Sequence, residues 1–190
     1  MESRTIFFGM EMSQAENMPL VLNRFLSKYK PQTIIEIGTF KGGLSALFQS
    51  YSLSFNKTFV TYDIKDHISN QDLHNSLKTN KKISDVFNLE TQNEIKHLIQ
   101  QEGVTVIFCD GGNKIKEFNI FSKYLKKGDF ILAHDYSKTI EFFNEKIKNK
   151  VWDWCEITDL DIQDACIENS LEKVFEEFDY VATTCRVKIC

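Results

Sequence analysis

Residues 33–43 read TIIEIGTFKGG, a short run of β-branched apolar residues that passes directly into a glycine-rich segment. The apolar part, residues 33–38, has the length and composition of a buried strand. Glycine permits positive φ and lets a ligand approach the backbone. Leu44, Leu47 and Phe48 then begin a helical pattern, and a helix N-terminus offers unpaired N–H groups. The stretch therefore predicts a strand, a ligand-binding loop and a helix, with a plain strand-to-helix turn as the alternative.

Apolar strand patterns and helical patterns continue to alternate on both sides of this stretch. Further strands are predicted over residues 57–63, 83–87, 104–110, 130–134 and 180–189, and helices over 14–29, 91–101, 115–126, about 135–147 and 171–178. Residues 159–168 read as a solvated acidic loop. Repeated strand–helix units close with right-handed crossovers, which predicts an α/β protein with a doubly wound, mostly parallel sheet and helices on both faces.

Length and composition indicate how many domains the chain can form. The chain has 190 residues, of which 42% are hydrophobic, enough to form one core. We expect a single domain over residues 1–190, with an N-terminal helical extension over 1–30. Residues 150–178, which include Trp152 and Trp154, are expected to cover a substrate; burial of both rings in the core is the alternative.

Charge and cysteine content indicate which partners and which cellular compartment to expect. The 23 basic and 27 acidic residues give a net charge of −4, and no cationic cluster stands out, so nucleic acid is not expected as a partner. No run of about 18 apolar residues predicts a membrane span, and residues 1–4 do not begin a signal peptide. The five cysteines form no C-x-x-C pair, which favours a reducing cytoplasm over a disulfide framework.

Acidic residues close the predicted strands, where doubly wound sheets bind ligands. Asp63 follows the second strand, and an acid roughly twenty residues past a glycine loop typically accepts hydrogen bonds from ribose hydroxyls; capping of a loop or helix is the alternative. The dinucleotide fingerprint G-x-G-x-x-G fails here because Phe40 stands at its second glycine, which gives a diphosphate room. These residues predict a nucleoside pocket without a diphosphate.

Four segments together resemble a known family. IIEIGTFKGG (34–43) resembles the first motif of class I S-adenosylmethionine-dependent methyltransferases, and VTYD (60–63) is similar to their second. FCDGGN (108–113) and LKKGDFILAHDY (125–136) are similar to later signatures of small-molecule O-methyltransferases, including the cephalosporin hydroxylase-like and macrolide-sugar group. The resemblance covers residues 30–137 and implies a Rossmann-like methyltransferase that methylates a hydroxyl of a small molecule, such as a sugar or polyketide-like metabolite.

The resemblance also implies a set of residues for S-adenosylmethionine. Glu36 and Gly38 would hold its methionine end, Asp63 its ribose, and Asp85 or Val86 its adenine. The implied cofactor-binding residues are Glu36, Gly38, Thr39, Phe40, Gly42, Asp63, Asp85, Val86 and Asp110.

Asp110, His134 and Asp135 occupy the positions where related metal-dependent O-methyltransferases place a cation. The resemblance therefore implies these three as catalytic residues and as ligands of a divalent cation, Mg²⁺ or Mn²⁺, which would lower the pKa of the acceptor hydroxyl. The sequence departs from the family pattern twice: His134 stands where an acid is usual, and Asn113 replaces a histidine. Without a metal, His134 is the natural general base. His134 and Asp135 share a site only if the strand ends at His134.

Two other functions stay open from the sequence: a nucleotide-dependent oxidoreductase on a Rossmann-like fold, and a non-catalytic relative that retains the cofactor pocket. The C-terminus leaves a structural alternative. The family sheet ends in an antiparallel strand pair, and only residues 180–189 are obviously extended, so this hairpin is short or one strand is absent. An exposed sheet edge would favour a homodimer.

Overall fold

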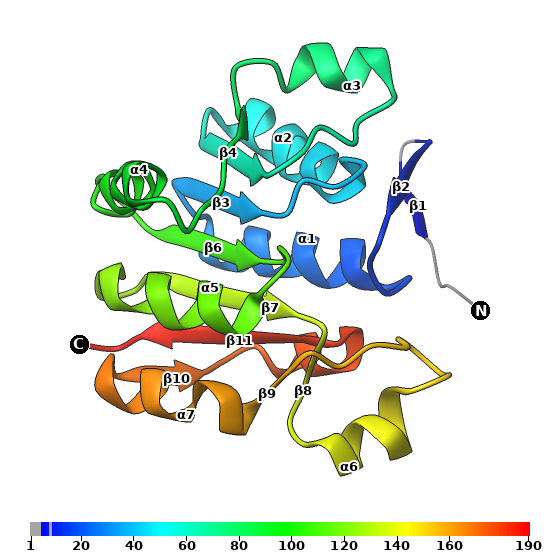
Figure 1. Cartoon of the computed structure of the whole chain (residues 1–190), viewed down its shortest axis with the longest axis vertical. Helices are drawn as coiled ribbons and strands as arrows, with labels where there is room; N and C mark the ends of the chain where they lie inside the picture. The colour runs from blue at the N-terminus through cyan, green and yellow to red at the C-terminus, as the bar shows by residue number, and fades with distance from the viewer. Residues whose placement is uncertain (1–4, 8) are drawn as a thin grey trace.

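A seven-stranded sheet organises the chain in the computed structural model, which describes residues 5–7 and 9–190. Its order is β10-β11-β7-β6-β3-β4-β5. The strands are β3 (Thr33–Ile37), β4 (Thr58–Asp63), β5 (Lys81–Ile83), β6 (Thr105–Cys109), β7 (Phe130–His134), β10 (Leu171–Lys173) and β11 (Thr183–Lys188). β3 to β7 are parallel, and β11 runs antiparallel to both of its neighbours, β7 and the edge strand β10 (Figure 1). This arrangement confirms the predicted doubly wound, mostly parallel sheet.

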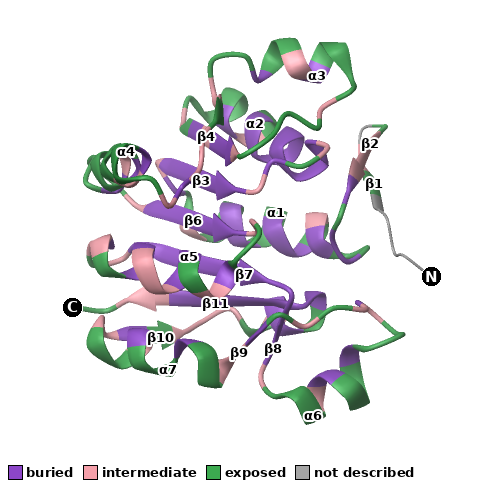
Figure 2. Cartoon of the chain, viewed as in Figure 1, coloured by how far each residue is buried: buried purple, intermediate pink, exposed green. Residues whose placement is uncertain are grey.

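Helices cover both faces of the sheet because its central strands are apolar on both sides. The α-helices are α1 (Met18–Tyr29), α2 (Gly43–Phe55), α3 (Gln71–Ser76), α4 (Leu89–Ile99), α5 (Lys114–Phe121), α6 (Ile140–Phe142) and α7 (Asp159–Glu168). Phe108 of β6 packs into a core with α1 and α2, while Ile107 beside it packs into a second core with α4, α5 and α7. All five residues of β6 are buried, as the purple centre of Figure 2 shows.

The N-terminal segment differs from the predicted helical extension. A hairpin of β1 (Thr5–Phe7) and β2 (Met10–Met12) precedes α1, and its turn contains Gly9 at a φ of 75°. The helix therefore begins at Met18 instead of residue 14, next to Pro19, which is favoured in a first helical turn. The prediction about a signal peptide concerns residues 1–4, which lie outside the described residues.

Three further predictions about elements are wrong. The third strand lies at Lys81–Ile83 and not at 83–87, because the Asp85 carboxylate accepts the backbone N–H of Phe87 (2.8 Å) and turns the chain. Residues 159–168 form α7, whose capping box joins Thr158 and Asp161. Residues 171–178, predicted as a helix, form β10 and part of a 3₁₀ turn (Glu176–Val181).

The C-terminal pair of strands is present and short. β10 has three residues and pairs with the end of β11, so tertiary pairing overrides the helical pattern of this segment. A dimer through this edge stays a prediction.

Residues 138–156 form a strap that joins two short parallel strands, β8 (Tyr136–Ser137) and β9 (Ile157–Thr158). The strap contains α6 and a π-helical turn (Phe143–Ile147), and then carries Trp152 and Trp154 back toward the sheet. Within the described residues, no helix has both the length and the apolar character that crossing a bilayer requires.

Candidate functional site

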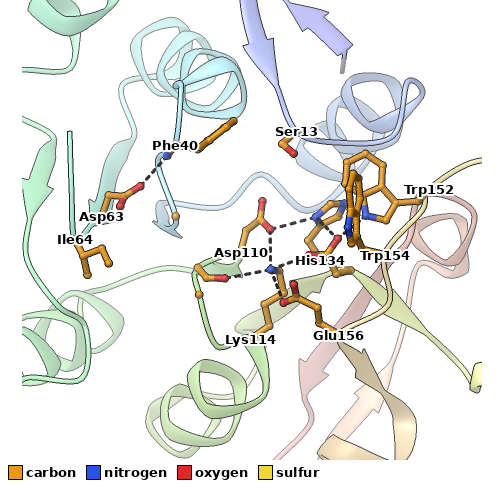
Figure 3. Close-up of a pocket in the computed structure, with 14 residues that line it drawn as sticks. Ser13, Phe40, Asp63, Ile64, Asp110, Lys114, His134, Trp152, Trp154 and Glu156 are labelled. Carbon is orange, nitrogen blue, oxygen red and sulfur yellow. Dashed lines mark hydrogen bonds and ion pairs between the residues drawn. The ribbon is translucent and has the colours of Figure 1, made fainter. Parts of the chain in front are cut away.

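Two adjoining cavities open at the carboxyl ends of the parallel strands. The first has a volume of about 370 Å³ and the second about 220 Å³, and they share Gly38, Asp63, Ile64, Gly111 and Gly112. They lie where β3 and β6 separate the two halves of the strand order, which is the position at which doubly wound sheets bind ligands. Asp63 and Phe40 line one end of the first cavity, Trp152 and Trp154 the other (Figure 3).

The glycine-rich loop packs against β6 so closely that only glycine fits at 38. Gly38 has a φ of 97°, and a Cβ there would lie 2.3 Å from the backbone oxygen of Asp110. The next residues turn sharply, with Phe40 at a φ of 46°, and the Phe40 N–H donates to Asp63 Oδ2 at 2.8 Å. Asp63 therefore holds the loop and also lines both cavities.

Three of the predicted cofactor residues line neither cavity. Glu36 is fully buried and accepts a hydrogen bond from Ser45 Oγ at 2.5 Å, and burial raises the pKa of Glu36 to about 8. Thr39 is also buried, with its hydroxyl 2.6 Å from that of Thr61. Gly42, at a φ of 83°, lies against the side chain of Leu73. Any effect of these residues on a ligand passes through the loop.

Asp85 and Val86 line the second cavity, beyond Asp63. Val86 is buried and presents an apolar surface, while the Asp85 carboxylate is held in its own turn. Glu117 of α5 lines the same cavity, and burial raises its pKa to about 7. The cavity thus combines apolar side chains with three acids, Asp63, Asp85 and Glu117.

Asp110, His134 and Asp135 converge at the first cavity. His134 Nδ1 lies 3.2 Å from Asp110 Oδ1 and 3.3 Å from Asp135 Oδ1. β7 ends at His134, and Asp135 adopts a φ of 55°, which turns its carboxylate to the side of the preceding residue. The condition that the sequence left open, a strand ending at His134, is therefore met.

The carboxylates define the tautomer and the ionisation of His134. Because Nδ1 faces two carboxylate oxygens, we place the proton of the neutral ring on Nδ1. Nε2 is buried and has no hydrogen-bond partner among the described residues. Burial alone lowers the pKa of His134, but Asp110 and Asp135 outweigh it and leave that pKa above its ordinary value.

Sequence reasoning missed Lys114, the first residue of α5. Its ammonium lies 2.8 Å from Asp135 Oδ2 and 3.7 Å from Asp110 Oδ1. It also lies 3.0 Å from Glu156 Oε2 and donates to the backbone oxygen of Gly111 at 3.1 Å. Burial alone lowers the pKa of Lys114, but these acids raise it above its ordinary value. The one available signal was a lysine directly after the DGGN segment.

Residues from distant segments complete the wall. Trp152 Nε1 donates to Asp135 Oδ1 at 2.5 Å, and the Trp152 ring packs edge-on against His134. Trp154, 43% exposed, packs on Trp152 at the mouth of the cavity. Before α1, Gln14 Nε2 donates to Asp110 Oδ2 at 2.5 Å. The two tryptophans thus lie in the cavity wall, although Trp152 is also a core residue.

The sequence matches no protein-family model and no curated protein. Solved structures do match. The apo structure of CmcI-N160 is 13% identical and has a TM-score of 0.68, over 97% of this chain and 76% of that one. The Mg-SAM structure of CmcI-D160 is 16% identical and has a TM-score of 0.61, over 96% of this chain and 76% of that one. A putative O-methyltransferase from Klebsiella pneumoniae is 12% identical with a TM-score of 0.53, over 92% and 80%. The chain therefore shares its Rossmann-like fold with solved structures that include methyltransferases.

Proposed function

We propose that the protein is an S-adenosylmethionine-dependent methyltransferase that methylates a hydroxyl group of a small molecule. One observation carries the proposal: Asp63 and the glycine-rich loop line one end of the cavity at whose other end His134 lies between two carboxylates. A nucleoside held at the first end reaches toward a proton acceptor at the second. The fold of the structural neighbours supports the same class of enzyme.

The cofactor residues follow the wall of the two cavities. Asp63 would accept hydrogen bonds from the ribose hydroxyls, and the second cavity, with Val86, would hold the adenine. The loop at Gly38 would carry the methionine end, next to Asp110. S-adenosylmethionine supplies an electrophilic methyl group on a cationic sulfonium, and an acidic cavity favours such a cation.

His134 would act as the general base. Its Nδ1–H donates to Asp110 and lies beside Asp135, so the Nε2 lone pair would take the proton of the acceptor hydroxyl. With S-adenosylmethionine bound, the acceptor oxygen would attack the methyl carbon while the carbon–sulfur bond breaks to leave S-adenosylhomocysteine, and the hydroxyl proton would pass to His134 Nε2. Asp110 and Asp135 then stabilise the imidazolium.

The acceptor side of the cavity is both aromatic and acidic. Trp152 and Trp154 offer flat surfaces on which a sugar ring or a polyketide-like ring can pack. Glu156 adds a carboxylate at the same end. Acidic walls disfavour an anionic acceptor, so a neutral hydroxyl compound fits best.

Loss of the Asp63 carboxylate tests the cofactor assignment. We expect Asp63→Ala to weaken binding of S-adenosylhomocysteine by about 1.5–3 kcal/mol, the usual value for hydrogen bonds to a charged group, roughly tenfold to a hundredfold in Kd. Titration calorimetry measures the affinity of each variant for S-adenosylhomocysteine. Asp72→Ala removes an equal charge from an exposed position on α3 and serves as the control. An unchanged affinity in Asp63→Ala would refute the ribose assignment.

Detection of transfer separates an enzyme from a non-catalytic relative. We expect radioactive methyl from S-adenosylmethionine to appear on at least one member of a panel of sugar and polyketide hydroxyl acceptors. The His134→Ala variant should bind the cofactor and lose transfer. Retained transfer in that variant would contradict the general-base role.

A further inference from the structure

We propose that the ammonium of Lys114 takes the place of a divalent cation in this site and leaves proton removal to His134. The part of this proposal that concerns catalysis rests on the proposed methyltransferase function, while the part that concerns metal binding does not. The evidence is the set of contacts around Asp110 and Asp135, which Figure 3 shows as dashed lines that meet at Lys114.

All three protons of the Lys114 ammonium have acceptors. The Asp135 carboxylate lies at 2.8 Å, the Glu156 carboxylate at 3.0 Å and the Gly111 carbonyl oxygen at 3.1 Å. An ammonium has three donors and no acceptor, so this set uses its full capacity. The Lys114 side chain is 6% exposed, so little of it is open to water. Lys114 is thus a built-in counter-ion of the acidic cluster.

The residues present do not fit a divalent cation while Lys114 keeps this position. Mg²⁺ requires oxygen ligands at about 2.1 Å, so an ion on Asp135 Oδ2 would lie within about 5 Å of the ammonium. Two like charges at that separation repel each other. The rest of the donor set is engaged too: Asp135 Oδ1 accepts from Trp152, and Asp110 Oδ2 accepts from Gln14.

Lys114 acts through the carboxylates and not on the acceptor. It has no proton to spare for the acceptor oxygen, unlike a metal ion, which keeps open positions for substrate. It instead holds Asp135 and partly neutralises Asp110, the two acids that face His134 Nδ1. His134 is 1% exposed, and its Nε2, which has no partner among the described residues, is the group left to receive a proton. Lys114 is a positioning residue.

Binding of Mn²⁺ to the purified protein tests the inference. Electron paramagnetic resonance and calorimetry measure this binding. We expect the wild-type protein to bind Mn²⁺ no better than Asp135→Asn does. Lys114→Met, which keeps the length of the side chain and removes the charge, should bind Mn²⁺ at least about tenfold more tightly than wild type. Lys114→Arg and Lys123→Met, a charge removed from an exposed position, should not gain this binding. A residue that only supported the fold would not produce a gain.

Two results would overturn the inference. The first is wild-type Mn²⁺ binding that Asp135→Asn abolishes, which needs no Lys114 variant to fold. The second is a folded Lys114→Met protein that gains no binding over Lys123→Met. Calorimetry with S-adenosylhomocysteine on the same samples reports on the proposed function separately, because failure to bind it leaves the Mn²⁺ result intact.

Discussion

Glu36 shows how one residue of the glycine-rich segment affects stability. Burial raises its pKa to about 8 from an ordinary value of 4.5, so the folded chain holds this proton more tightly than the unfolded chain. The stabilisation is complete below the unfolded pKa and is lost as the pH rises through the folded pKa. The relevant window is therefore about pH 5 to pH 8.

Glu36→Gln removes this dependence because an amide stays neutral and can still accept from Ser45. Between about pH 5 and pH 8, the free energy of unfolding of the wild type should fall by a few kcal/mol relative to the variant. Urea denaturation across this range measures the difference. Glu90→Gln, an exposed acid on α4, is the control, and its curve should parallel that of the wild type. Parallel curves for Glu36→Gln as well would mean that Glu36 is ionised in the folded chain.

Helix α5 depends on Asn113, which caps its N-terminus. Asn113 Oδ1 accepts the backbone N–H of Lys116 at 3.0 Å, and the Asn113 N–H donates to Glu117 at 3.2 Å. We expect Asn113→Ala to lower the free energy of unfolding by about 1 kcal/mol and Asn113→Asp to retain most of it, as measured in urea. The residue that replaces a histidine of the family motif therefore has a structural role here. Equal stability of the alanine variant and the wild type would contradict this role.

The central strands could be predicted from the sequence because each is a run of consecutive apolar residues, which indicates burial without knowledge of the neighbouring strands. Residues 33–38, 104–110 and 130–134 were predicted as strands, and β3, β6 and β7 lie within these ranges. Each is short and apolar on both faces, a pattern that is typical of strands buried inside a parallel sheet. The edge strand β10 reads LEK and depends on its pairing with β11, which residues 171–173 do not reveal. Helix α7 had a local signal, Thr158 and Asp161, that the acidic composition obscured.

The site was predicted only where its residues follow strands. Asp63, Asp110 and His134 were found because they end or follow apolar runs and resemble family motifs. The contacts of Lys114 join α5, the end of β7 and the strap, so no spacing along the chain indicates them. The positive φ of Asp135, which brings its carboxylate beside His134, is uncommon for a residue other than glycine. Tertiary structure supplies both features.

At the scale of the whole molecule, the site lies across both halves of the sheet. Its walls come from the ends of β3, β4, β6 and β7 and from the strap, which are separated in sequence and lie together at one edge of the sheet (Figure 1). A ligand that touches all of them binds the folded chain and not the unfolded one. Such a ligand raises the free energy of unfolding by mass action.

S-adenosylhomocysteine should therefore raise the melting temperature, whereas NAD should not. At a concentration of about 100 times Kd, the gain is about 2.7 kcal/mol, or roughly 5–10 °C for a domain of this size. NAD carries a diphosphate, and Phe40, with its backbone N–H already bonded to Asp63, stands where the dinucleotide fingerprint has its second glycine. Differential scanning fluorimetry compares the two ligands, and the shift with S-adenosylhomocysteine should shrink in Asp63→Ala. A large shift with NAD and none with S-adenosylhomocysteine would instead favour a nucleotide-dependent oxidoreductase, because only that class needs the diphosphate to fit against this loop.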